Sequence, residues 1–331
     1  MSSALHPPLA GRTVLITGIQ GFIGIHTAAA AYRLGARVAG MDIVAESARA
    51  RRVRESLGAP PVEVRAVDLL DPQASGQALR AMRPDVVVHC AGSIERDAGT
   101  EDWARVFSGN AALTASLVEI LRALPGTERP VLVMPGSQME YGAAPMPWTE
   151  DQPCEPINAY GAGKLAATES VVEAARRDEL RACVLRLPIV FGPGQPPALF
   201  VPELIGKALR KEAIPMTEGR QRRAFLYVED AAGLLLETAA RAVREDAFPS
   251  LLNAPACAPV AIRELAEMLA GQLDATELLR PGALPNRAGE PLDAWPDIAL
   301  AASLGLRAAT PLVEALRKTV EWYQANPWFL A

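Results

Sequence analysis

Residues 13–42 constrain the fold more than any other segment of this 331-residue chain. A short apolar run ends at Thr17, and the turn after it contains Gly18, Gly21 and Gly24. Glycine at such positions permits a tight turn, close approach of the backbone to a pyrophosphate, and close packing of the following helix on the strand. The start of that helix also offers unpaired N–H groups to phosphate. A second apolar run ends at Asp42, whose carboxylate can bind ribose hydroxyls, so the segment predicts a dinucleotide-binding βαβ unit.

Strand and helix patterns alternate through the first half of the chain. We expect strands at 13–17, 37–42, 62–68, 85–92, 130–137 and 181–190, and helices at 22–34, 47–57, 101–124 and 159–177. A further helix begins at Asp71, with the aspartate as N-cap and Pro72 in the first turn. The apolar runs lack in/out alternation, as is typical of parallel strands that are covered on both faces.

The pattern changes after residue 190, where a Gly- and Pro-rich segment interrupts the alternation. Short strands and helices come after it, with helices expected at 229–243, 260–270 and 311–324. We therefore predict an α/β fold with a doubly wound, parallel Rossmann sheet and a smaller C-terminal α/β substrate domain. The expected boundaries are 1–188 for the NAD(P)-binding domain, with a returning segment near 226–254, and 189–331 for most of the substrate domain.

Composition excludes several classes of partner. The net charge is −5 without a basic stripe, which argues against nucleic acid. No apolar run is long enough to span a membrane, and the first residues do not resemble a signal peptide. The four cysteines are widely scattered without a CxxC pair, which predicts no metal site and reduced thiols in a cytoplasmic protein.

Tyr160 and Lys164 lie four residues apart in the helix expected at 159–177, so both side chains share one helix face. An ammonium beside a phenol favours the phenolate, and a tyrosine so tuned can exchange a proton with a substrate hydroxyl. Ser137 ends the fifth expected strand, where α/β sheets bind their ligands, and its hydroxyl can hydrogen-bond a substrate oxygen as charge develops. These three residues are the candidate catalytic set.

These motifs resemble the short-chain dehydrogenase/reductase superfamily. The segment TGIQGFIG is similar to the TGxxGFIG motif of its extended branch, the NAD-dependent epimerase/dehydratase family, and Ser137 precedes a Tyr-Gly pair as in that family. The resemblance implies that Asp68 lies beside the adenine, that Ala91 and Gly92 line the cofactor groove, and that Asn110 supports the active site. The full cofactor set that we expect is Gly18, Gly21, Phe22, Ile23, Gly24, Asp42, Asp68, Leu69, Ala91, Gly92, Asn110 and Pro188. Tyr141, His26 and His89 also match family positions, and we interpret them as structural.

The expected cofactor is NAD, because the Asp42 carboxylate repels the 2′-phosphate of NADP. NADP stays possible, since Arg49, Arg51 and Arg52 come soon after Asp42.

Two arginines indicate the substrate. By resemblance, Arg223 of GRQRRAFLYVEDAA and Arg287 of RAGEPLDAWPDIALAASLG would bind the diphosphate of a nucleotide sugar. Many sugar-nucleotide enzymes carry an asparagine where this chain has Ile189, which keeps a non-sugar ketone open as substrate.

The residues directly after Ser137 limit which reactions of the family this chain can catalyse. Family dehydratases place acids directly after the catalytic Ser or Thr, whereas this chain has Gln138 and Met139; Glu140 comes one place later. This leaves chemistry at carbon 4 of the sugar, either reduction of a 4-keto sugar or 4-epimerisation. The chain looks most like the GDP-6-deoxy-4-keto-mannose reductases, which favours reduction.

The catalytic set is intact, which argues against a non-catalytic NAD(P)-binding regulator. The resemblance also implies a homodimer through the helices at 101–124 and 159–177. We expect the acidic cluster around Glu150, Asp151 and Glu155 to be a solvated loop.

Overall fold

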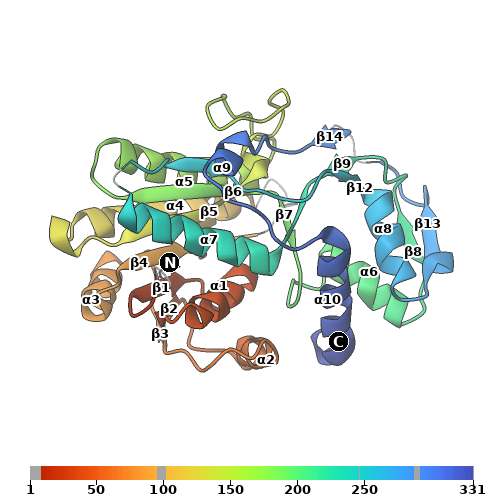
Figure 1. The fold of residues 1–331 in the computed structure, drawn as a ribbon, viewed down its shortest axis with the longest axis horizontal. Helices are drawn as coiled ribbons and strands as arrows, with labels where there is room; N and C mark the ends of the chain where they lie inside the picture. Colours follow the sequence, from red (N-terminus) through yellow and green to blue (C-terminus); the bar gives the residue numbers. More distant parts are fainter. Residues whose placement is uncertain (1–8, 95–101, 246, 287–290, 331) are drawn as a thin grey trace, which may run out of the picture. The chain divides into compact units, whose positions relative to one another are not determined.

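A computed structural model describes residues 9–94, 102–245, 247–286 and 291–330. These residues form two compact units. Unit 1 comprises residues 1–144, 149–187 and 232–254, and unit 2 comprises 145–148, 188–231 and 255–331. Figure 1 shows the course of the chain through both units.

Unit 1 is an open parallel sheet with helices on both faces. Its strands are β1 (Thr13–Thr17), β2 (Arg37–Asp42), β3 (Val64–Ala66), β4 (Val86–His89), β5 (Val131–Ser137), β6 (Ala182–Leu187) and β11 (Leu251–Asn253). Its helices are α1 (Phe22–Arg33), α2 (Ala48–Ser56), α3 (Pro72–Met82), α4 (Trp103–Arg122), α5 (Ala159–Arg176) and the greater part of α7 (Val228–Arg244), with short 3₁₀ turns η1 (Gly126–Glu128) and η2 (Gln138–Glu140).

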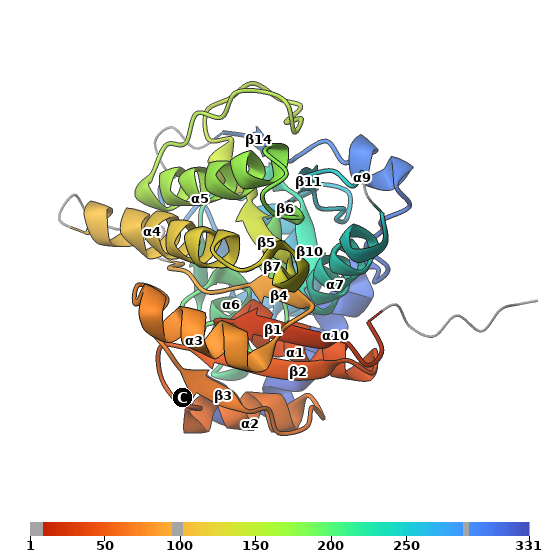
Figure 2. The same cartoon turned by 90° about the vertical axis from the view of Figure 1, so that its left-hand side faces the viewer.

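The strands of unit 1 have the order β11-β6-β5-β4-β1-β2-β3, and all their pairings are parallel. The order reverses at β1, so the carboxyl ends of β1 and β4 diverge into loops that run in opposite directions. This confirms the predicted Rossmann-type α/β fold. Helices α3, α4 and α5 lie along one side of the sheet, and α1 and α7 lie along the other (Figure 2).

A large apolar core joins the sheet to α3, α4 and α5. Leu15, Val87 and Leu132 from neighbouring strands pack with Leu117 of α4 and Val171 of α5, and all five side chains are fully buried. Strands β4, β5 and β6 are buried along their whole length, which accounts for their unbroken apolar sequences.

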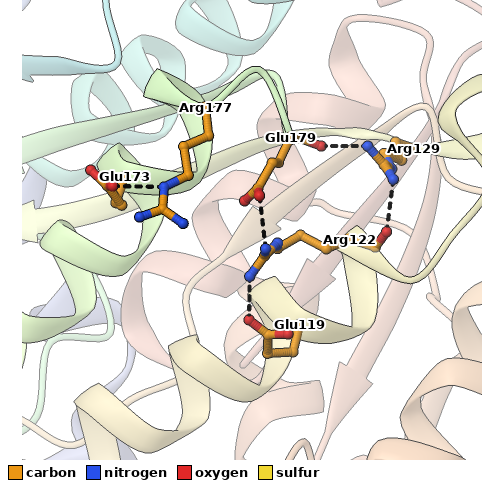
Figure 3. A network of polar contacts seen from close by, with 6 residues as sticks. All are labelled: Glu119, Arg122, Arg129, Glu173, Arg177 and Glu179. Atoms are coloured by element: carbon orange, nitrogen blue, oxygen red, sulfur yellow. Dashed lines mark hydrogen bonds and ion pairs between the residues drawn. The ribbon is translucent and has the colours of Figure 1, made fainter.

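An ionic network ties the end of α4 to the turn after α5 (Figure 3). The Arg122 guanidinium donates to the carboxylates of Glu119 (2.6 Å) and Glu179 (2.8 Å). Arg129 donates to the main-chain oxygens of Arg122 and Glu179, both at 2.8 Å. Because the network is partly exposed, it fixes geometry more than it stabilises the fold.

Unit 2 contains short strands and helices. Its strands are β7 (Ile189–Phe191), β8 (Ile214–Met216), β9 (Arg222–Arg223), β10 (Phe225–Tyr227), β12 (Val260–Ala261), β13 (Leu279–Pro281) and β14 (Asp293–Ala294). Its helices are α6 (Phe200–Leu209), α8 (Ile262–Gly271), α9 (Ala299–Ser303) and α10 (Leu312–Ala325), with 3₁₀ turns η3 (Thr276–Leu278) and η4 (Pro327–Phe329).

The strand expected at 181–190 is two strands. β6 ends at Leu187, and β7 begins at Ile189 and pairs with β10 in a separate two-stranded sheet. Pro188 lies at the break, because proline has no N–H with which to continue the ladder. The stretch that returns to unit 1 is 232–254, and residues 226–231 belong to unit 2.

The Gly- and Pro-rich segment also contains a helix that the sequence did not predict, α6, which starts at Phe200. Among the described residues, no helix is both long and apolar enough to cross a membrane.

Candidate active site

The glycine loop brings three parts of the backbone into close approach. Gly18 comes directly after β1 with a φ of 63°, and a Cβ there would lie 2.6 Å from the Cα of Ala91. A Cβ on Gly24 would lie 2.2 Å from the carbonyl oxygen of Gly18. A side chain at either position would therefore displace backbone, and only glycine permits this loop to close.

Helix α1 begins directly after this loop without a side-chain cap. Its N-cap is Gly21, which has no side chain with which to cap the N–H groups of Phe22 and Ile23 in the first turn. Such a helix start, approached closely by glycine backbone, fits a pyrophosphate.

Asp42, at the end of β2, is held by two main-chain donors. Its carboxylate accepts from the N–H groups of Gln20 (3.1 Å) and Ile43 (2.9 Å). The Gln20 side chain donates to the carbonyl oxygen of Val44 (2.9 Å) and accepts from the N–H of Ser47 (2.6 Å). Gln20 thus clamps the glycine loop to the segment after β2. This role was not predicted from the sequence, because Gln20 occupies a variable position of the motif.

The other expected cofactor residues come after β3 and β4. The Asp68 carboxylate accepts from the N–H of Leu70 (2.9 Å), and the Leu69 carbonyl accepts from the hydroxyl of Ser116 on α4 (2.5 Å). Gly92 packs on Asn110, since a Cβ at Gly92 would lie 2.7 Å from the Asn110 Oδ1. Because parallel strands share one carboxyl edge, these residues and the glycine loop lie along the same edge of the sheet.

The candidate catalytic residues come from β5 and α5. Ser137 is the last residue of β5, and its hydroxyl oxygen accepts from the N–H of Met139 (3.2 Å). The buried Lys164 donates from Nζ to the carbonyl oxygen of Pro135 (2.5 Å), two residues before Ser137. Tyr160 is partly buried and lies one turn before Lys164. It is in the first turn of α5, where Asn158 caps the helix by accepting from the N–H of Gly161. The two helix residues are thus anchored beside the strand that carries the serine.

Two glycines between them allow α5 to approach its neighbours. A Cβ on Gly161 would lie 2.4 Å from the carbonyl oxygen of Met139, and one on Gly163 would lie 2.9 Å from that of Phe107 on α4. The first contact presses α5 on the turn after Ser137, and the second presses it on α4. The glycines in YGAGK therefore position the helix that carries Tyr160 and Lys164, a role that spacing alone did not reveal.

A buried ion pair supports the turn after Ser137. Glu140 accepts from the N–H of Ser137 through Oε1 (2.7 Å) and from Arg186 Nε through Oε2 (2.7 Å). The carboxylate is fully buried and the guanidinium nearly so. Burial raises the pKa of Glu140, and the nearby Arg186 opposes that shift. Both carboxylate oxygens of Glu140 thus accept hydrogen bonds from the protein.

Tyr141 is a structural residue of the same cluster. It is fully buried, its hydroxyl donates to Asn253 Oδ1 (2.7 Å), and the Arg186 guanidinium lies 4.4 Å from its ring centre. Burial raises the pKa of Tyr141 to about 12, which makes it a poor proton donor to substrate. Glu150 is not part of a solvated loop as expected: it is partly buried and accepts from the N–H of Asn253 (2.7 Å). Asp151 and Glu155 are exposed.

Comparison with known proteins places this site in a family. The family model "NAD dependent epimerase/dehydratase family" matches residues 14–248. The chain belongs to this family. It is therefore an enzyme of the extended short-chain dehydrogenase/reductase type, and its cofactor is NAD.

The names of similar proteins refer to nucleotide sugars. One relative, dTDP-6-deoxy-L-talose 4-dehydrogenase (NAD(P)(+)) of Kitasatospora kifunensis, is 29% identical over 94% of this chain and 96% of its own length. A UDP-glucose 4-epimerase of Mycolicibacterium smegmatis is 26% identical over 94% of this chain and 98% of its own. The crystal structure of Thermotoga maritima UDP-glucose 4-epimerase with UDP-glucose has a TM-score of 0.81 at 21% identity, covering 95% and 99% of the two chains. The narrower resemblance to GDP-6-deoxy-4-keto-mannose reductases stays a prediction.

Of the two expected substrate residues, the structure describes Arg223, in unit 2. Arg223 is buried, and its guanidinium donates to the main-chain oxygens of Arg222 (2.8 Å), Pro291 (2.9 Å) and Leu292 (3.2 Å). Arg223 therefore fixes the 291–292 segment, and its role as a diphosphate ligand stays a prediction. Arg287 lies outside the described residues. The described residues contain no group of three or more His, Cys, Asp or Glu side chains arranged to bind a metal ion.

Proposed function

We propose that this enzyme reduces the 4-keto group of a nucleotide-linked deoxysugar, with the 4-dehydrogenase reaction as its reverse. The observation that carries the proposal is that both carboxylate oxygens of Glu140 already accept hydrogen bonds from the protein. Gln138 and Met139 directly after Ser137 cannot act as acids, and the Glu140 carboxylate in the same turn is bound by Arg186 and by the N–H of Ser137. A dehydration would need a free carboxyl group here to remove a proton and expel water. Simple hydride transfer needs none, and the K. kifunensis relative is named for a reaction of this type.

The residues of the chain have separate roles in this reaction. NADH, when bound, supplies the hydride. The glycine loop and the start of α1 hold its pyrophosphate, and Asp42 binds the adenosine ribose. The Ser137 hydroxyl donates a hydrogen bond to the carbon-4 oxygen, and Tyr160 gives that oxygen its proton. Lys164, anchored by its hydrogen bond to the Pro135 oxygen, would hold the nicotinamide ribose beside Tyr160.

A 4-epimerase is the second candidate, and the similarity to the M. smegmatis UDP-glucose 4-epimerase favours it. An epimerase must retain its cofactor through oxidation, rotation of the sugar and reduction, whereas a reductase releases it at each turnover. Retention of the cofactor therefore separates the two reactions.

The experiment monitors NADH absorbance after addition of a dTDP-4-keto-6-deoxyhexose. We expect stoichiometric loss of NADH that Tyr160→Phe abolishes. Tyr141→Phe is the matched control: it also removes one tyrosine hydroxyl, and since that hydroxyl donates to the buried Asn253, turnover at 25 °C should persist. NAD that copurifies and no net oxidation of NADH would indicate the epimerase. A folded protein that binds NADH and reduces only non-sugar ketones would refute the nucleotide-sugar proposal, and Ile189 would then explain the choice.

We also propose that the enzyme is a homodimer through α4 and α5. Sedimentation equilibrium tests this, and a monomer at micromolar concentration would refute it.

A further inference from the structure

A chain of buried hydrogen bonds runs across unit 1 between β1 and α4. Thr17 is the last residue of β1 and His89 the last residue of β4, and the two are paired in the sheet. Thr17 Oγ1 lies 2.7 Å from His89 Nδ1, and His89 Nε2 lies 3.1 Å from Thr114 Oγ1 on α4. All three side chains are buried. The imidazole thus bridges a strand that feeds the glycine loop and a helix packed against the sheet.

The partners at the two ends fix the direction of every hydrogen in this chain. At one end, the N–H of Ala91 can only donate, and it points to Thr17 Oγ1 at 3.4 Å. At the other end, the main-chain oxygen of Asn110 can only accept, and it takes the Thr114 hydroxyl proton at 2.9 Å. Met134 Sδ, 3.7 Å from the same hydroxyl, is a weaker acceptor that would also draw this proton away from His89.

These contacts allow one tautomer of the His89 imidazole. If Thr114 donates away from the ring, its oxygen must accept from Nε2–H, and Nδ1 must accept from the Thr17 hydroxyl. The opposite tautomer would leave the Thr17 hydroxyl proton without an acceptor among the contacts of the described residues. A protonated ring would force both threonines to accept, and the Thr17 hydroxyl would lose its acceptor in the same way.

We propose that His89 is a positioning residue for the cofactor groove: as the neutral Nε2–H tautomer it orients the Thr17 hydroxyl, which then holds the N–H of Ala91 against the glycine loop. Gly18 and Ala91 pack there backbone to backbone, as the 2.6 Å approach of a Cβ at Gly18 shows. The other end of the chain is fixed by Asn110, whose side-chain amide donates to the carbonyl of Ser93 (3.2 Å), two residues beyond Ala91. The segment 91–93 is therefore held at Ala91 by the Thr17 hydroxyl and at Ser93 by the Asn110 side chain.

The surroundings of the ring favour the neutral form. His89 is fully buried, and burial and the Lys164 ammonium lower its pKa to about 3. The neighbouring Cys90 thiol stays protonated because burial raises its pKa to about 12.

The tautomer is tested directly by long-range ¹H–¹⁵N spectra of protein labelled with ¹⁵N-histidine. The chain has three histidines, so His89 is assigned by comparison with His89→Gln. We expect a protonated shift for Nε2 and an unprotonated shift for Nδ1 at pH 7. A protonated Nδ1, or an imidazolium, would overturn the proposal. This measurement uses the wild-type protein without substrate, so its outcome does not depend on the proposed reaction.

Positioning is tested by two matched substitutions, Thr17→Val and Thr114→Val. Each replaces one buried hydroxyl by a methyl group of similar size and leaves one His89 nitrogen without its threonine partner. Both variants should therefore lower the midpoint of thermal unfolding by similar amounts. Only Thr17→Val frees the N–H of Ala91, and we expect it to raise the Kd for NADH about tenfold, the effect of one lost buried hydrogen bond. Thr114→Val should change this Kd less than threefold, and Thr17→Ser should restore it. Equal effects of the two valine variants on the Kd, or none, would show a purely structural histidine and overturn the proposal.

Discussion

Acidification from pH 7 to pH 5 should weaken the fold through the buried imidazole of His89. Burial and the Lys164 charge lower its pKa from 6.5 to about 3. In the unfolded chain the imidazole regains its ordinary pKa, so between these values the unfolded state binds a proton that the folded state excludes. The free energy of unfolding therefore falls as pH falls, by about 1.4 kcal/mol per pH unit below 6.5. Between pH 7 and pH 5 the loss from this one residue is about 2 kcal/mol.

Urea denaturation at intervals of half a pH unit measures this loss. Carboxylates also begin to titrate near pH 5, so the wild type is compared with His89→Gln, which keeps an amide near Thr114 but cannot bind a proton. The difference between the two proteins should shrink by about 2 kcal/mol from pH 7 to pH 5. Parallel pH profiles for the two proteins would show that His89 titrates equally in the folded and unfolded states, and would refute the argument.

Four further substitutions test other contacts. Gly163→Ala places a Cβ 2.9 Å from the Phe107 oxygen and should lower the free energy of unfolding by about 1–3 kcal/mol. Its control is Gly233→Ala, which is exposed within α7 with nothing within 4 Å of the added Cβ and should raise that free energy by about 1 kcal/mol. Urea titration measures both variants, and a loss of stability at both positions would contradict the steric argument. Gly24→Ala drives a Cβ to 2.2 Å from the Gly18 oxygen and should weaken NADH binding at least tenfold by calorimetry; unchanged affinity would mean that the loop does not hold the pyrophosphate. Glu140→Gln leaves the Arg186 charge buried without its partner and should cost about 3–5 kcal/mol in denaturant, and a loss under 1 kcal/mol would show that the pair is dispensable.

Local chemistry made much of unit 1 predictable. Asp71 and Pro72 predicted the start of α3, and in the structure the Asp71 carboxylate accepts from the N–H groups of Gln73 and Ala74. The run 37–42 predicted β2 to the residue, because a short apolar strand between a glycine turn and an acid leaves little freedom. These features depend on neighbours in sequence, and local pattern captures them.

Contacts between distant segments were not predictable in this way. Glu140 and Arg186 form their ion pair across 46 residues, and neither position carries a local signal for it. Glu150 was expected in a solvated loop for the same reason, since its partner Asn253 comes 103 residues later. Helix α6 was missed because the glycines and prolines before it dominate the pattern, although the helix itself starts only at Phe200.

The division of the chain has a consequence for recombination. The glycine loop, Asp42, Ser137, Tyr160 and Lys164 all belong to unit 1, whereas unit 2 is built from three separate stretches of sequence. Exchange of all residues from 188 onward with a relative would split both units, because residues 232–254 supply β11 and most of α7 to unit 1 and residues 145–148 belong to unit 2. A chimera that keeps each unit whole needs crossovers near 187, 231 and 254 together with residues 145–148. A library restricted to the three stretches of unit 2 would leave every candidate catalytic residue native.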